Sequence, residues 1–180
     1  IYNIVDQIFI GQGVGYLGNA ATNVAYPFST ICLAIALLVG IGSASRVSLC
    51  LGRKEPKAAA KAAGNGIVLM GIFGIIYLLV GETFLPLLLK AFGATTDVFP
   101  YAKRYASITL IGMPFLIVTN GMSNLIRADG KPKYSMVCMV MGAIINTILD
   151  PIFIFACDWG IAGGACATVI GQIFSFILAL

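Results

Sequence analysis

The sequence has 180 residues, of which 59% are hydrophobic and only 10% are charged, and its mean hydropathy is +0.99. A soluble domain of this size could not bury so much apolar surface, so the composition predicts an all-α protein that crosses a membrane several times. The net charge of +4 does not indicate nucleic-acid binding, because the basic residues lie in short loops and at helix ends and no nucleic-acid motif is present. The lack of histidine, with five scattered cysteines, excludes the usual zinc sites and imidazole chemistry.

Six helices are expected, because a membrane-spanning helix needs about 20 mostly apolar residues and polar stretches interrupt the apolar runs. The first is the second half of a helix, over residues 1–10, and a Gly-rich stretch ends it. The other helices are expected at residues 20–45, 64–89, 105–126, 135–156 and 160–180. The sequence begins without Met inside one apolar run and stops inside another, so we expect a fragment shortened at both ends; no signal peptide is visible.

Two of the connecting loops concentrate positive charge. Residues 46–61 carry five basic residues against one acid, and residues 127–133 carry three against one. Two helices separate these loops, so they are expected on the same side of the membrane. The positive-inside rule predicts that this side is cytoplasmic.

Small residues recur in the sixth expected helix. Gly163, Ala167, Gly171 and Ser175 are each four positions apart and therefore share one helix face. Such a stripe lets two helix backbones approach closely in a membrane, so a tight helix contact is predicted along it.

Two aspartates lie inside apolar runs, Asp6 in the first helix and Asp150 in the fifth. A carboxyl group at membrane depth is costly and usually faces a cavity or a partner. In one shared cavity, mutual repulsion and burial would favour protonation of one of the pair, which could then carry H⁺. Asn146 lies one helical turn before Asp150 on the same face, and Pro151 leaves the Thr147 carbonyl without its usual donor.

These oxygens predict a site for a coupling ion, either H⁺ or Na⁺, with Na⁺ expected at Asp6, Asn146 and Asp150. Asn120 in the fourth helix and Thr168 in the sixth would complete the site, although each alone is more typical of an interhelical hydrogen bond. Candidate cavity-lining side chains are Asn3, Gln7, Tyr26 and Gln172. No cofactor besides the coupling ion and no catalytic residue is predicted.

Several segments together resemble the multidrug and toxic compound extrusion (MATE) antiporters, and the likeness covers essentially the whole sequence. The segments are YNIVDQIFIGQ, GIGSASRVSLCLGRKEPKAA, PFLIVTNGMSNLIRADGKPKYSM, NTILDPIFIF and GIAGGACATVIGQ. Members of this family have twelve helices in two lobes of six, and they exchange Na⁺ or H⁺ for cationic and amphiphilic drugs. The resemblance implies that residues 1–180 are the N-terminal lobe of such a transporter, truncated at both ends.

The resemblance also implies a set of site residues and partners. It places the cation site of this lobe at Asp6, Asn120, Asn146, Asp150 and Thr168. The expected partners are small organic cations and drugs, the lipid bilayer and a C-terminal lobe of the same chain. The expected location is the bacterial plasma membrane, with several passes.

Alternatives to a drug antiporter remain open. A lipid-linked oligosaccharide flippase of the same broad fold would be expected to carry cationic residues in its cavity, whereas every Lys and Arg here lies in a loop or at a helix end. An intramembrane aspartyl protease would use two membrane aspartates, but their contexts here are Val-Asp-Gln and Leu-Asp-Pro. A third alternative is an inert truncated product. The preferred interpretation is therefore a secondary transporter and not an enzyme, with the coupling ion and the substrate left open.

Overall fold

The computed structural model describes the backbone of residues 2–157 and 159–180, and the side chains of these residues except 2–5 and 156. In this part of the chain six α-helices follow one another: α1 (Tyr2–Gly13), α2 (Tyr16–Gly52), α3 (Pro56–Ala91), α4 (Phe99–Ala128), α5 (Pro132–Pro151) and α6 (Ile161–Ala179). A short π-helix, η1 (Ile152–Ala156), continues directly from α5. Five helices are long and apolar enough to cross a membrane, so the predicted all-α polytopic fold is confirmed.

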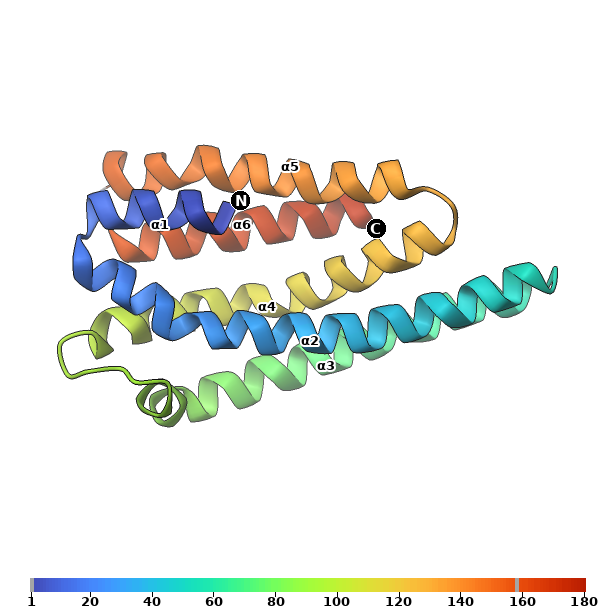
Figure 1. Cartoon of the computed structure of the whole chain (residues 1–180), viewed down its shortest axis with the longest axis horizontal. Coiled ribbons are helices and arrows are strands. Elements are labelled where there is room, and N and C mark those ends of the chain that lie inside the picture. Colours follow the sequence, from blue (N-terminus) through green and yellow to red (C-terminus); the bar gives the residue numbers. More distant parts are fainter. Residues whose placement is uncertain (1, 158) are drawn as a thin grey trace.

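The helices form two groups that meet along α4 and α6. Figure 1 shows α1, α5 and α6 side by side in one group, with α2, α3 and α4 in the other. The junction between the groups is made mainly by α4 packing on α6. The arrangement leaves α1, the shortest α-helix, between α5, α6 and the start of α2.

The predicted ends of the second and third helices are wrong. The expected loop over residues 46–61 is mostly helical, and only residues 53–55 separate α2 from α3. The charged residues of this segment end the apolar span but do not end the helix, since Arg and Lys are good helix formers. Pro56 then occupies the first turn of α3, where a missing N–H costs nothing, and the Ala-rich stretch after it favours helix.

The other boundaries differ for similar reasons. The first helix continues past residue 10 to Gly13, and the chain turns at Gly15, whose positive φ of 82° suits glycine. The fourth helix begins at Phe99 rather than near residue 105, and the loop predicted over 127–133 shrinks to residues 129–131. Within the segment expected as a fifth helix over residues 135–156, the helix type changes from α to π directly after Pro151.

Close contacts between small residues hold α4 at the centre of its group. A Cβ on Gly40 of α2 would lie 2.8 Å from the Gly121 Cα of α4, and a Cβ on Gly74 of α3 would lie 2.9 Å from the Pro114 Cα. Neither helix pair could approach this closely with larger side chains at these crossings. The α4 side chains around them, such as Leu110 and Ile117, are fully buried.

The predicted small-residue stripe of α6 is confirmed as a packing face. Gly163, Ala167, Gly171 and Ser175 are all buried. A Cβ on Gly171 would lie 2.8 Å from the Gly142 carbonyl oxygen of α5, and one on Gly163 would lie 2.7 Å from the Phe153 backbone of η1. The stripe therefore brings α6 against α5 and η1 along its whole length, which positions the polar side chains described below.

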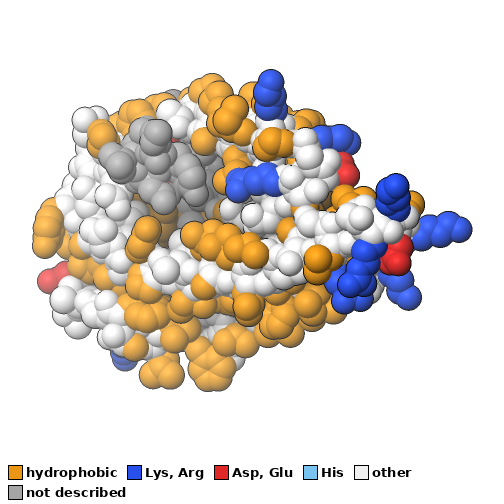
Figure 2. Space-filling view, turned by 45° about the vertical axis from the view of Figure 1, so that its right-hand side comes forward, with side chains coloured by type: hydrophobic (Ala, Val, Ile, Leu, Met, Phe, Trp, Pro, Cys, Tyr) orange, Lys and Arg blue, Asp and Glu red, His pale blue; other side chains and the backbone are white. Residues whose placement is uncertain are grey.

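The outer surface is that of a membrane protein. Large apolar side chains such as Leu38, Leu79 and Ile177 are more than 60% exposed, as expected where lipid rather than water is the solvent. Figure 2 shows hydrophobic side chains spread over the visible face, while Lys and Arg gather mostly at one end of the molecule. The two basic connections, 53–55 and 129–131, lie at that end of Figure 1.

Candidate cation-binding site

Polar side chains from three helices meet inside the α1, α5 and α6 group. Asp6 comes from α1, Asn146 and Asp150 come from α5, and Thr168 comes from α6. The two α5 residues share one face because they are four positions apart. Asp150 is fully buried, Asn146 is 3% exposed and Asp6 is 5% exposed. The structure thus brings together four of the five residues that the sequence assigned to a cation site, and their role as ion ligands stays a prediction.

A chain of hydrogen bonds connects these four side chains. The Asn146 amide Nδ2 donates to Asp150 Oδ1 at 3.4 Å and to Thr168 Oγ1 at 3.3 Å. Thr168 Oγ1 in turn lies 3.2 Å from Asp6 Oδ2 and 2.9 Å from the Gly164 carbonyl oxygen. Residues 162 positions apart in the sequence are joined in this way, and the Thr168 hydroxyl group links α6 to α1.

The cluster holds more acceptors than donors. Asp6 Oδ1, Asp150 Oδ2 and Asn146 Oδ1 are buried and have no donor among the described residues. The carboxyl groups of Asp6 and Asp150 also lie close enough to interact directly with each other. Two carboxylates in contact at this depth repel each other unless a proton or a metal cation lies between them.

The hydrogen bonds of Thr168 also call for a proton or a cation in the cluster. Its hydroxyl group has one proton for two acceptors, the Gly164 carbonyl and Asp6 Oδ2. Both contacts are satisfied when Asp6 itself donates a proton or when a cation bridges the oxygens. The described residues include no group of three or more His, Cys, Asp or Glu side chains that could hold a metal ion. Two carboxyls, an amide and a hydroxyl offer oxygen ligands of the kind that bind H⁺ or a hard monovalent cation such as Na⁺.

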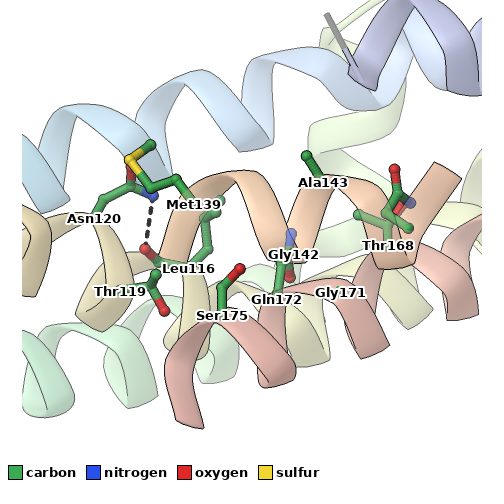
Figure 3. Close-up of a pocket in the computed structure, with 11 residues that line it drawn as sticks. Leu116, Thr119, Asn120, Met139, Gly142, Ala143, Thr168, Gly171, Gln172 and Ser175 are labelled. Carbon is green, nitrogen blue, oxygen red and sulfur yellow. Dashed lines mark hydrogen bonds between the residues drawn. The ribbon is translucent and has the colours of Figure 1, made fainter. Parts of the chain in front are cut away.

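Asn120 lies apart from this hydrogen-bond chain. Its amide Nδ2 donates to the Leu116 carbonyl oxygen at 2.9 Å, within α4. It lines a cavity between α4, α5 and α6 that Asn146 and Thr168 also line, and Figure 3 shows Asn120 and Thr168 at opposite ends of it. Asn120 therefore shares a cavity with the cluster, but among the described residues it forms no hydrogen bond with the carboxyl groups of Asp6 and Asp150.

The candidate cavity-lining residues divide between two cavities. Gln172 lines the cavity of Figure 3, with a buried Oε1 that has no donor in the described part of the chain. Gln7 and Tyr26 line a second cavity that also includes Asp6, and Gln7 Nε2 donates to Asn23 Oδ1 at 3.3 Å. The side chain of Asn3 lies outside those that the structure describes. The polar cluster thus separates two cavities, with Asp6 on one side and Asn146 on the other.

Several polar residues of the second cavity were missed in the sequence. Thr22 and Ser29 of α2 line it together with Thr109 of α4. Thr22, Tyr26 and Ser29 follow one another at spacings of four and three, which places them on one helix face. That periodicity was a usable signal, whereas Thr109 sits in an otherwise apolar stretch and carries no such pattern.

The sequence of this chain matches a known protein family. Residues 1–152 match the MatE family. The chain belongs to the MatE family. It is 29% identical over 174 residues to the multidrug export protein MepA of Staphylococcus aureus, covering 96% of this chain and 38% of MepA. It is equally similar, at 29% over 182 residues, to the probable multidrug resistance protein YpnP of Bacillus subtilis, covering 99% of this chain and 40% of YpnP.

Solved structures of transporters share the fold. An inward-facing multidrug resistance MATE family transporter of the MOP superfamily superposes with a TM-score of 0.94 at 26% identity, over 99% of this chain and 40% of that one. A MOP superfamily transporter from Pyrococcus furiosus, described by a reversed polarity of its binding pocket, gives a TM-score of 0.92 at 26% identity, over 99% of this chain and 39% of that one. The MatE chain described here spans about 40% of the length of the relatives that it matches.

Proposed function

We propose that this MatE chain is the N-terminal lobe of a secondary antiporter that exports cationic or amphiphilic organic compounds in exchange for H⁺ or Na⁺. The observation that carries the proposal is the buried cluster of Asp6, Thr168, Asn146 and Asp150, which joins three helices through groups able to bind a small cation. Relatives named for multidrug export support the same activity. Alternating access would then come from movement of this lobe against a second one.

The cluster offers a physical basis for coupling. With a proton or Na⁺ bound, Asp6 and Asp150 can stay in contact and α1 stays attached to α5 and α6. Without the cation the two carboxylates repel each other. This repulsion would push Asp6 away and weaken its hydrogen bond with Thr168, which joins α1 to α6. Ion occupancy would therefore shift α1, which contributes to the cavity beside Asp6, and so change the affinity for substrate.

The two cavities favour a cationic or neutral substrate over an anionic one. Their described lining residues include Asn120, Gln172, Met139 and Tyr26 but no Lys or Arg. Amide oxygens, a thioether and an aromatic ring suit flat apolar cations. A flippase for pyrophosphate-linked sugars would instead need cationic groups in the cavity, and none lines either of these cavities.

Membrane orientation is part of the proposal. We place the basic end of the lobe, with the turns at residues 53–55 and 129–131, on the cytoplasmic side of a bacterial plasma membrane. This assignment follows the positive-inside rule. The two cytoplasmic loops predicted from the sequence, 46–61 and 127–133, correspond in the structure to these short turns and the helix ends beside them.

The test is drug efflux by the full-length protein in sealed vesicles, driven either by an imposed pH gradient or by an imposed Na⁺ gradient. One of the two gradients should drive accumulation of a fluorescent organic cation, and Asp6→Asn and Asp150→Asn should each weaken that dependence by about tenfold or more. Efflux that continues undiminished in both variants, or that requires neither gradient, would overturn the proposal. Conversion of Asp129, an exposed carboxylate paired with Lys131, to Asn provides the matched control.

A further inference from the structure

The two longest helices extend well beyond the hydrocarbon layer. At about 1.5 Å per residue, the 37 residues of α2 and the 36 residues of α3 are each about 55 Å long, against about 30 Å of bilayer hydrocarbon. Along α2 the first charged residue after a charge-free run of 30 residues is Arg46, and along α3 the last basic residue before the apolar span is Lys61. Both lie about 9 Å below the turn that joins the helices, at the depth of lipid headgroups.

Arg46 and Lys61 face the same groove between α2 and α3. The groove is also lined by Gly42, Ser43, Asn65 and Leu69. At its base the helices touch, because a Cβ on Gly66 would lie 2.5 Å from Ser43 Oγ, whereas a Cβ on Gly42 would meet nothing within 4 Å. The groove is therefore closed at its base by a close helix contact and open beside Gly42.

Neither cation of the groove has an acidic partner among the residues that the structure describes. The single ion pair among the described residues joins Lys131 to Asp129, in another turn. Arg46 and Lys61 are both exposed, and the groove lining includes no Asp or Glu. Ser43 and Asn65 add a hydroxyl and an amide donor beside them. Cationic side chains with neighbouring neutral donors are the groups that bind phosphate in proteins.

We propose that this groove binds the headgroup of an anionic glycerophospholipid in the leaflet at the basic end of the lobe. A lipid fits better than a soluble anion because two stripes at i, i+4 spacing lead from the cations into the apolar region. On α2 the stripe is Arg46, Gly42 and Leu38, and on α3 it is Lys61, Asn65, Leu69 and Phe73. Leu38 is 77% exposed and Leu69 is 44% exposed, so acyl chains would find apolar contact directly below the bound phosphate.

An anionic lipid is preferred over a zwitterionic one for a simple reason of charge. A zwitterionic headgroup brings its own ammonium group next to Arg46 and Lys61, where no carboxylate is present to receive it. A phosphodiester with a neutral headgroup, as in phosphatidylglycerol, brings only negative charge. Basic pockets between membrane helices on the cytoplasmic side bind anionic headgroups such as that of cardiolipin.

The experiment measures lipid retained by the full-length protein after purification, by native mass spectrometry in mixed micelles of phosphatidylglycerol and phosphatidylcholine. Arg46→Gln combined with Lys61→Gln should lower phosphatidylglycerol retention about tenfold or more. The matched control is Arg53→Gln with Lys57→Gln, which removes equal charge from the turn after α2 and from the first turn of α3, outside the groove lining, and should change retention less than twofold. Gly42→Leu keeps both cations and fills the open side, so it should also reduce retention.

Three outcomes would overturn the proposal. Equal losses in the groove pair and the control pair would mean that general surface charge, and not the groove, attracts lipid. Unchanged retention in Gly42→Leu together with unchanged retention in the Arg46/Lys61 variant would place the lipid elsewhere. Displacement of the bound species by inorganic phosphate alone would identify a site for soluble anions. Thermal unfolding of each variant, expected to be unchanged, confirms that the losses are not due to misfolding.

Discussion

Both helix groups of this MatE lobe pack closely through glycines, but only the α1, α5 and α6 group adds a buried cluster of acids to that packing. Around α4 the helices meet at glycines, with Gly40 against Gly121 and Gly74 against Pro114, so stability there comes from close apolar packing. Around α1 the contacts that distinguish the group are hydrogen bonds among buried acids, an amide and a hydroxyl. Packing of the first kind does not depend on ion concentration, whereas the second kind must change when a proton or Na⁺ enters or leaves. The comparison suggests a rigid group and a responsive one within a single lobe.

The largest expected effect is a loss of ion dependence when a carboxyl of the responsive group, α1, α5 and α6, is removed. Asp150→Asn keeps an oxygen that can accept from Asn146 but removes the charge of a fully buried carboxyl. Losing a charge-assisted interaction with the coupling ion, worth about 1.5–3 kcal/mol, predicts a roughly tenfold to hundredfold weaker dependence on that ion. Efflux by the full-length protein against a titrated pH or Na⁺ gradient measures it. If Asp150→Asn behaved like the surface control Asp129→Asn, the responsive role of this group would be refuted.

A second prediction concerns the rigid group. Gly40→Val places a side chain against the Gly121 backbone and should destabilise the fold by about 1–3 kcal/mol, without altering the ion dependence of the folded protein. Thermal unfolding and efflux per folded molecule would be measured together. Gly42→Ala, two residues further along α2 where a Cβ meets nothing within 4 Å, is the control and should leave stability nearly unchanged. A changed ion dependence in Gly40→Val would erase the distinction between the groups.

A smaller effect on ion dependence is expected from removing the hydrogen bond that joins α1 to α6. Thr168→Val keeps the shape of the side chain but removes the hydroxyl that reaches Asp6 and Asn146, which predicts a loss of about 0.5–1.5 kcal/mol, or a several-fold weaker ion dependence. Thr147→Val is a close control, because Thr147 Oγ1 bonds only to the Ala143 carbonyl of its own helix in the described structure. Equal effects of the two substitutions would show that the bridge to Asp6 is unimportant.

The smallest effect is expected at Asn120, whose substitution should change substrate affinity but not ion dependence. Because Asn120 lines the cavity of Figure 3 but bonds within α4, Asn120→Ser should change the apparent affinity for the exported cation by about two- to threefold and leave ion dependence intact. Dose–response curves for drug and for the coupling ion distinguish these quantities. Asn124→Ser, one turn along α4 and outside the cavity lining, should change neither. A shift in ion dependence with Asn120→Ser would instead return Asn120 to the ion site.

The sequence predicted what depends on composition and helix periodicity. Long charge-free runs fix the number of membrane helices, and the i, i+4 spacing of Asn146 and Asp150 fixes their common face. It could not predict the helix ends, since Arg46 and Lys61 mark the edge of the apolar layer while the helices continue through them. Nor could it predict that Asn120 points into a neighbouring cavity, because the rotation of α4 relative to α5 is set by the glycine contacts of α4 with other helices.

The length of the α2 and α3 pair has a mechanical consequence. Gly40 contacts α4 at a point about 18 Å from the tip of α2 at Gly52, and the helix beyond it continues without a break. A tilt of only about 5° around that contact would displace the tip by about 1.5 Å, so small adjustments deep in the membrane become measurable movements at its surface. A spectroscopic label near residues 53–55 would therefore report motion of the lobe more sensitively than a label inside the bundle.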